Sequence, residues 1–464
     1  MNKYHFLIRL IISTVVLSST TVHGITFDQA WKKVLQNSDT LAAERKNIER
    51  AEHLQEASSD LFLPTITLGA NYTRLDHAIK VVPSDVVDSM PIDNLNQVLG
   101  STMPDIDGLL TSTLTGRDIF PSSIRALWPI YTGGRINAAQ HIAKAQQEES
   151  VYLLAMKRQA KFEDLAKYYF AVVLAKQVLK TRIDVEQGLK VHFEHAQKLE
   201  AQGQINKLER LQAQASYDKS RVDRQKSLRD LEITQIALTR LLKVNNIVTP
   251  QTDLFINKSL PNMTEYLDKT LSDYPGLKIL DAKKKQVSGL IDVEKGKYHP
   301  EVYLYGNYNL YEEDNLASEI APDWEVGIGV SIPILNSSGR SGKLKAAHSS
   351  VMQINYLRAQ AIQDLSVLVE KTYREANQSL EEYQGLASSI ELANENFKLR
   401  TKAFAQGLST SIDVIDAQLF IASIKTQRLA AAYKYVVSLA KLLAVSGEIN
   451  SFTHYQSYQG IKVN

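Results

Sequence analysis

The chain has 464 residues, of which 44% are hydrophobic and 22% are charged, so its composition is that of a folded protein rather than a disordered one. Lysine and arginine number 53 against 51 acidic residues, and this balance gives no basic excess of the kind that nucleic-acid binding requires. Cysteine is absent from the sequence, which excludes disulfides, thiolate metal sites and a cysteine nucleophile.

The N-terminus has the pattern of a secretory signal peptide. Basic residues, Lys3 and Arg9 among them, precede an apolar run from Leu10 to Leu17, and a small residue, Gly24, follows it. The run is shorter than the roughly 20 apolar residues that a membrane helix needs. We therefore expect residues 1–24 to be an export signal, and the rest of the chain to be soluble or to enter a membrane as strands.

The sequence also contains an internal duplication. The best preserved matches are Pro64 with Pro300, Tyr72 with Tyr308, and Ala201-Gln202-Gly203 with Ala405-Gln406-Gly407. Matches that keep register over such lengths indicate a true repeat. The first copy carries an insertion between Tyr72 and Pro129, and the boundary between the copies lies near Pro250, in a stretch rich in turn residues.

Each copy is expected to contain short helices, then two strands, then a long helical hairpin. In the first copy, residues 25–250, the strands are predicted near 63–74 and 122–131 and the hairpin near 135–243. In the second copy, residues 251–450, they are predicted near 298–311, 323–335 and 340–446, and residues 451–464 form a C-terminal tail.

The predicted strands alternate in polarity. In the first strand Ile66, Leu68 and Tyr72 share one face, and polar or small residues occupy the other. Strands of about ten residues with one apolar face are typical of outer-membrane barrels. A bilayer tolerates no open sheet edge, and four strands are too few to close a barrel. We therefore expect the chain to share its barrel with other copies of itself.

The helical hairpins begin where glycine and proline mark the change from strand to helix. Pro129, Gly133 and Gly134 do so in the first copy, and Pro333 and Gly339 in the second. No proline interrupts the roughly 65 residues that follow Gly134, a length that as a helix would extend roughly 100 Å. Apolar residues spaced by three and four along it predict coiled-coil packing.

Together these motifs resemble one known family over essentially the whole mature chain. The motifs are Trp128–Arg135 and Ile332–Asn336 at the strand ends, 201–203 and 405–407 at the hairpin turns, and Ser411–Gln418 after the second turn. In this order, and present twice, they resemble the TolC-type outer-membrane efflux proteins.

The resemblance implies a mixed α+β membrane fold. Four strands of each chain would join a shared twelve-stranded outer-membrane β-barrel in a homotrimer, and the coiled-coil hairpins would form a periplasmic α-barrel. The function implied is a passive exit duct of a tripartite efflux pump or type I secretion system, without catalysis or cofactor. The implied partners are a periplasmic adaptor protein and an inner-membrane transporter, with lipid around the barrel.

The resemblance also implies roles at the hairpin tips. The residues expected to contact the adaptor are Gly203, Gln204, Gly407, Leu408 and Ser409. Asp413 and Asp416 occupy the positions of acidic residues that ring the periplasmic aperture, and Glu209 is the equivalent of Asp413 in the first copy. The alternative is that Asp413 and Asp416 only cap a helix N-terminus. Where the best-known member has a tyrosine and an arginine that latch the second tip, this chain has Phe404 and Ser409, so those gating contacts are not carried over.

Other functions have weaker support. His192 and His195 are spaced to bind a metal from one helix, but no third ligand lies nearby in sequence, and the favoured interpretation is a solvated coiled-coil face. A periplasmic adaptor or a coiled-coil scaffold without a pore would also contain a long hairpin. Neither needs two hairpins with four strands of matched polarity.

Overall fold

The computed structural model describes residues 23–82, 111–311, 316–335, 337–457 and 460–463, so most of the predicted export signal lies outside the described residues. The chain divides into two compact units. The unit called here the hairpin unit consists of Met1–Asn47, Val151–Ile279 and Arg358–Asn464; the sheet unit consists of Ile48–Ser150 and Leu280–Leu357. Each unit draws on both repeats, so packing divides the chain differently from the duplication.

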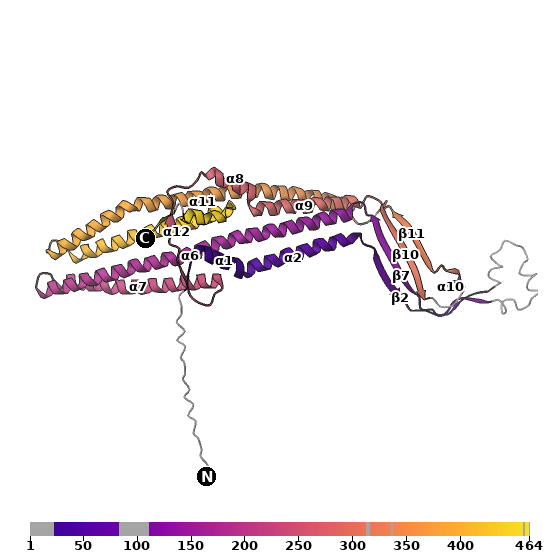
Figure 1. Ribbon diagram of the computed structural model, residues 1–464, viewed down its shortest axis with the longest axis horizontal. Coiled ribbons are helices and arrows are strands. Elements are labelled where there is room, and N and C mark those ends of the chain that lie inside the picture. The colour runs from indigo at the N-terminus through magenta and orange to yellow at the C-terminus, as the bar shows by residue number, and fades with distance from the viewer. Residues whose placement is uncertain (1–22, 83–110, 312–315, 336, 458–459, 464) are drawn as a thin grey trace, which may run out of the picture. The chain divides into compact units, whose positions relative to one another are not determined.

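The sheet unit contains a four-stranded antiparallel sheet in the order β11-β10-β7-β2 (Figure 1). Its strands are β2 (Thr65–Ala70), β7 (Ser122–Tyr131), β10 (Glu301–Tyr311) and β11 (Trp324–Ser331). Beyond β2 and β7, short strands pair β3 (Thr73–Arg74) with β6 (Asp118–Ile119) and β4 (Ile79–Val81) with β5 (Ser112–Thr115). Helix α10 (Leu316–Ile320) lies between β10 and β11 in the chain.

Three strands are shorter than the sequence predicts, and the one predicted over 298–311 begins at Glu301. The strand predicted over 63–74 is divided into β2 and β3, and the strand predicted over 323–335 ends at Ser331. Pro333 lacks an amide hydrogen and so cannot extend the β11 ladder. Pro129 is accommodated inside β7, next to a register shift opposite Val302 and Tyr303.

The strand pairing places apolar and polar residues on opposite faces of the sheet. Leu68, Ile124, Tyr308 and Trp324 lie side by side across the four strands in one row, and the next row is Thr67, Arg125, Asn307 and Glu325. The apolar side chains stand in the open, with Leu68 72% and Val326 74% exposed. The alternation predicted from the sequence is therefore confirmed as two faces of one sheet.

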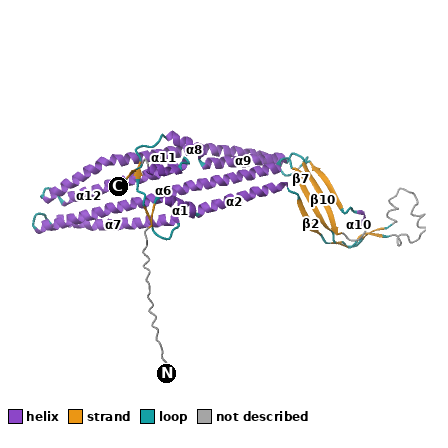
Figure 2. Ribbon diagram, in the orientation of Figure 1, coloured by secondary structure: helices purple, strands orange, loops and turns teal. Residues whose placement is uncertain are grey.

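The hairpin unit holds the turns of two helical hairpins (Figure 2). The hairpins are α6 (Arg135–Ala201) with α7 (Lys207–Leu242), and α11 (Arg340–Ala405) with α12 (Ser411–Val445). The remaining helices are α1 (Phe27–Asn37), α2 (Asp39–Ser59), α8 (Met263–Asp273), α9 (Pro275–Gly296), α13 (Phe452–Ser457) and the 3-10 turns Asp60–Phe62 and Ile449–Ser451. None of the described helices combines the length and the hydropathy that a membrane span requires.

The core of the hairpin unit is aromatic. Phe27 of α1 packs against Phe162, Tyr169 and Phe170 of α6 and against Phe452 of α13, with ring centroids 4.7–5.6 Å apart. The unit also contains two short strand pairs. β1 (His23–Ile25) pairs in parallel with β8 (Val248–Pro250), and β12 (Ile461–Lys462) pairs antiparallel with β9 (Phe255–Ile256). The segment predicted as a tail is therefore part of the fold.

The strand-to-helix junctions of the sheet unit depend on glycine. Gly133 and Gly134 have φ of +64° and +82°, and Gly339 has φ of +69°, a region that other residues adopt only with strain. An arginine follows each junction and binds it to a neighbouring segment. Arg135 forms an ion pair with Glu301 at 2.6 Å, and Arg340 donates to the carbonyl oxygens of Lys297 and Pro333.

Candidate functional site at the hairpin tips

The two hairpin tips have the same backbone turn. In the first, Gly203 donates to the Glu200 carbonyl and Gln204 to the Leu199 carbonyl; in the second, Gly407 and Leu408 donate to the carbonyls of Phe404 and Ala403. These are the two bonds of a Schellman motif, with glycine in the left-handed position at φ of +69° and +71°. The sequence match between the tips is thus a match of geometry.

The helix that leaves each tip is capped by a polar side chain. Asn206 accepts from the amide of Glu209 at the start of α7, and Thr410 accepts from the amide of Asp413 at the start of α12. At the second tip the Asp413 carboxylate returns to the Thr410 amide at 2.9 Å and closes a capping box. At the first tip the equivalent carboxylate, that of Glu209, is used elsewhere.

Glu209 connects the two tips. Its Oε2 accepts a 2.6 Å hydrogen bond from the backbone amide of Ser411, the first residue of α12. The amides at a helix N-terminus carry partial positive charge and lack partners within the helix, so a carboxylate there is stabilising. A carboxylate of the first repeat therefore caps a helix of the second.

His192 makes a second connection at the same residue. Its Nε2 lies 2.6 Å from the Ser411 hydroxyl, and its ring lies 4.7 Å from that of Phe404. The histidine is only 6% exposed, so the expectation of a solvated face is wrong for His192, whereas His195 is exposed. Burial, with a smaller contribution from His195, lowers the His192 pKa from 6.5 to about 4, so the ring is neutral at pH 7.

The predicted aperture residues have different surroundings. Asp413 accepts from Ser409 and Thr410 and forms an ion pair with Arg400 at 3.3 Å. The Thr410 backbone bond is the main cause of its lowered pKa, with help from the two hydroxyls and Arg400. Asp416 is exposed and has no hydrogen bond or ion pair within the described part of the chain. Helix capping thus explains the contacts of Asp413, and Asp416 takes no part in it.

An apolar cluster supports these polar contacts. Phe404 and Val414 of the second hairpin are buried with Ala196 and Ala213 of the first. Phe404 is 3% exposed, so the residue that departs from the family latch is itself a contact between the hairpins. Of the tip residues predicted to meet an adaptor, Gly203, Gln204, Gly407 and Leu408 are exposed and Ser409 is half-buried.

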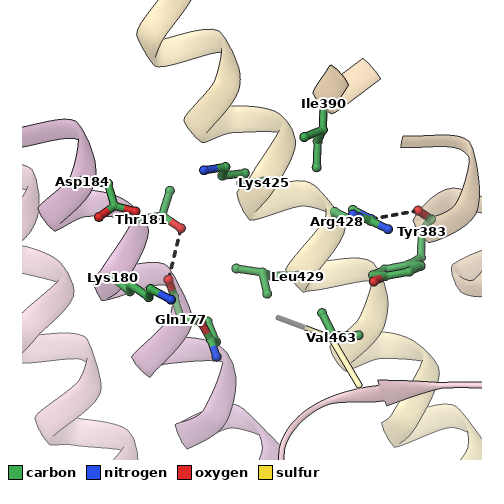
Figure 3. A pocket seen from close by; sticks show the side chains of 10 residues that line it. All are labelled: Gln177, Lys180, Thr181, Asp184, Tyr383, Ile390, Lys425, Arg428, Leu429 and Val463. Carbon is green, nitrogen blue, oxygen red and sulfur yellow. Dashed lines mark hydrogen bonds between the residues drawn. The ribbon is translucent and has the colours of Figure 1, made fainter. Parts of the chain in front are cut away.

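We call the contact between the two hairpins the seam. Further along it, α6 and α12 line a pocket (Figure 3). Lys180, Lys425 and Arg428 line it, against a single acid, Asp184. Arg428 lies 4.1 Å from the ring centre of Tyr383 and donates to its carbonyl oxygen, and Figure 3 shows the two side by side. The arginine is therefore held by Tyr383 of α11.

No metal site accompanies these features. Within the described residues, no group of three or more histidine or acidic side chains is placed to hold a metal ion. The geometry of the tips is that of a contact between hairpins, with carboxylates and exposed turns.

The sequence matches the outer membrane efflux protein family over residues 30–242 and 267–448. The match includes both repeats and covers most of the chain. The chain belongs to the outer membrane efflux protein family. A comparison with curated protein sequences finds no match.

Solved structures of outer-membrane channels share the fold. The open-state MtrE channel of Neisseria gonorrhoeae is 17% identical with a TM-score of 0.70, over 91% of this chain and 89% of that one. The CmeC channel of Campylobacter jejuni is 14% identical with a TM-score of 0.70, over 97% and 93%. CusC, whose crystal structures concern transmembrane channel formation, is 14% identical with a TM-score of 0.73, over 92% and 93%.

The family match confirms the fold class and the channel function expected from the sequence. The protein is an outer-membrane efflux channel, and its family consists of transport channels rather than enzymes. The match gives no support to a periplasmic adaptor or a scaffold without a pore.

Proposed function

We propose that three copies of the chain form one duct, with their twelve strands closing a single barrel. The observation that carries this proposal is the sheet itself. β2 and β11 are its edge strands, and its apolar face is exposed. A bilayer tolerates neither an open edge nor fewer than about eight strands in a barrel. Pairing β11 of one copy with β2 of the next satisfies both edges, and three copies leave room for a pore.

The duct works as a passive exit. The barrel lies in the outer membrane with its apolar face toward lipid, and the hairpins extend into the periplasm. A periplasmic adaptor and an inner-membrane transporter complete the pump, and the transporter supplies energy and selects cargo. The exposed turns at Gly203–Gln204 and Gly407–Leu408 offer the adaptor a contact surface at the periplasmic end.

The periplasmic aperture is lined by Asp413, Asp416 and Glu209. Support comes from their position next to the tips: Glu209 and Asp413 lie in the first turns of α7 and α12, and Asp416 lies one turn after Asp413. Three copies bring together nine carboxyl groups around one mouth. Because Asp416 has no partner among the described residues, it is the group best placed to bind a cation there.

The mass of the detergent-solubilised protein tests the assembly. We expect a trimer that needs detergent to leave the outer membrane and forms ion-conducting pores in planar bilayers. A stable monomer, or release from the membrane without detergent, contradicts the duct.

A further inference from the structure

The polar face of the sheet carries two tyrosines that lie against glycines. Tyr305 is paired with Gly327 and Tyr303 with Gly329 across β10 and β11. A Cβ added at Gly327 would lie 2.6 Å from Cζ and Oη of Tyr305, and one added at Gly329 would overlap the Tyr303 ring. Each ring therefore occupies the space that a side chain on the neighbouring strand would fill.

These rings lie on the face that turns toward the interior of the proposed barrel. Tyr305 shares its row with Thr65 and Leu127, and the next row on the same face holds Arg125 and Glu325. Residues of both rows line one hollow over the sheet. The opposite face bears the apolar side chains exposed for lipid. Anything that passes through the duct passes these tyrosines.

The arrangement belongs to one repeat only. In the duplicated strands of the first repeat, the positions equivalent to Tyr303 and Tyr305 are Thr67 and Gly69. A Cβ added at Gly69 would meet nothing within 4 Å. On the polar face of the sheet, β10 thus carries the two aromatic rings, whereas β2 carries the small residues Thr65, Thr67 and Gly69.

We propose that Gly327 and Gly329 set the free width of the barrel by letting Tyr305 and Tyr303 lie flat against its wall. The inference rests on the proposed trimeric barrel. With glycine beneath them, six rings in three copies are recessed, and the pore passes bulky cargo. With any larger residue at these glycines, the rings stand into the pore and narrow it.

The clash at each glycine is relieved by the side chain and not by the strand. The atoms that an added methyl group meets are the far ends of the tyrosine rings, which rotate about their side-chain bonds. The backbone pairing of β10 with β11 needs no change. Substitution by alanine therefore alters the width of the pore while the barrel still forms.

The test uses a cysteine placed beyond the tyrosines. Ser331 is exposed, lies at the helix-side end of β11 and is paired with Glu301, two residues beyond the Tyr303–Gly329 pair and on the same face. The natural sequence has no cysteine, so the S331C variant contains a single thiol. Membrane-impermeant maleimides of increasing polyethylene glycol length are added to intact cells, and the labelling rate of Cys in S331C is measured for each size.

In S331C carrying G327A and G329A, we expect the rate for the largest reagent that labels the parent to fall about tenfold, because a barrel of this size is only a few side chains wide. The smallest reagent should react as before. Adding Y303A and Y305A to this variant should restore the rate. G69A in S331C is the matched control, since it adds the same methyl group to the same face without a clash.

Two results overturn the inference: an unchanged size limit in the double alanine variant, or a reduced one that Y303A and Y305A fail to restore. The second would mean that the glycines act through the strand. If the parent S331C reacts with no reagent of any size while the chain is in the outer membrane, the duct itself is contradicted, and the inference falls with it.

Discussion

The two hairpin tips share a turn and a cap but differ in what their equivalent carboxylates do. At the second tip Asp413 closes a capping box on its own helix. At the first tip Glu209 reaches out of its own helix to the Ser411 amide of the other hairpin. Duplication supplied the same first turn twice, and one copy now uses its acid locally while the other uses it to join the repeats.

The difference also concerns what lies behind each tip. The rings of His192 and Phe404 pack at a tilt between the hairpins; His192 contacts Ser411, and Phe404 is buried with Val414, at the start of α12. The start of α7 contacts the second hairpin through Glu209, which accepts from the Ser411 amide, and through Ala213, which is buried with Phe404 and Val414. The first residue of α12 is therefore contacted by both helices of the first hairpin, by α6 through His192 and by α7 through Glu209.

Removal of the buried ring should have the largest effect on this comparison. We expect His192→Ala to lower the free energy of unfolding of the hairpin ends by about 3 kcal/mol, since it leaves a cavity beside Phe404 and an unpaired Ser411 hydroxyl. Hydrogen exchange of the α12 amides near Ser411 measures the loss. His195→Ala, an exposed neighbour on the same helix, is the control, and an equal effect there contradicts the contact.

The same histidine makes the seam sensitive to acid. Its pKa is about 4 in the folded chain and 6.5 when exposed, so on acidification the open state takes up the proton first. The stability of the seam should be full above pH about 6.5 and fall as the pH decreases toward 4. In His192→Gln the fall should be smaller over this window. Parallel curves for the parent and the variant would assign the acid sensitivity to other groups.

Glu209 should rank next. Glu209→Ala removes a charge-assisted bond to an otherwise unpartnered helix amide, and we expect a loss of about 2 kcal/mol in the protection of the Ser411 amide. Glu209→Gln keeps an acceptor oxygen and should lose less. Asp413→Ala should expose the Thr410 amide and leave that of Ser411 protected. Loss of Ser411 protection in both variants would show that the tips do not differ.

Substitutions at the turns test what the tips share. Gly203→Ala and Gly407→Ala each place a methyl group in open space but force a left-handed backbone on alanine. We expect each to cost about 1 kcal/mol, and the two costs to be equal, in denaturant unfolding. Gly385→Ala, in α11 and also without neighbours, should be neutral or slightly stabilising. Unequal costs at the two turns would reveal a contact at one tip.

The smallest effect on stability should come from Asp416. The exposed carboxylate has no partner among the described residues, so Asp416→Asn should leave unfolding unchanged. If it lines the aperture, the same change should weaken block of the channel by divalent cations in planar bilayers. Asp413→Asn should alter both stability and block. Unchanged block in Asp416→Asn would remove Asp416 from the aperture, and unchanged block in both variants would leave helix capping by Asp413 as the only role of this acidic pair.

Periodicity predicted the elements, and it was insufficient for the contacts between them. The alternation through Ile66 and Leu68 gave the sheet faces because residues two apart share a side. The prediction of a solvated face is wrong for His192, which continues the spacing of Val185, Leu189 and Ala196, all of them buried. That spacing was the available signal. Glu209 and Ser411 lie on different hairpins, and no local pattern relates them.

The pairing of β7 with β10 has a consequence for biosynthesis. Register joins Ile124 to Tyr308, so the middle of the sheet forms only after the whole first hairpin has been made. Until then β2 and β7 are a two-stranded ribbon, which is at most marginally stable in water. The hairpin unit cannot be completed before then either, because it includes segments from three parts of the chain, the last of which begins at Arg358. A nascent first repeat is thus not half of a folded protein, and during export it must be kept from aggregating until the second repeat arrives.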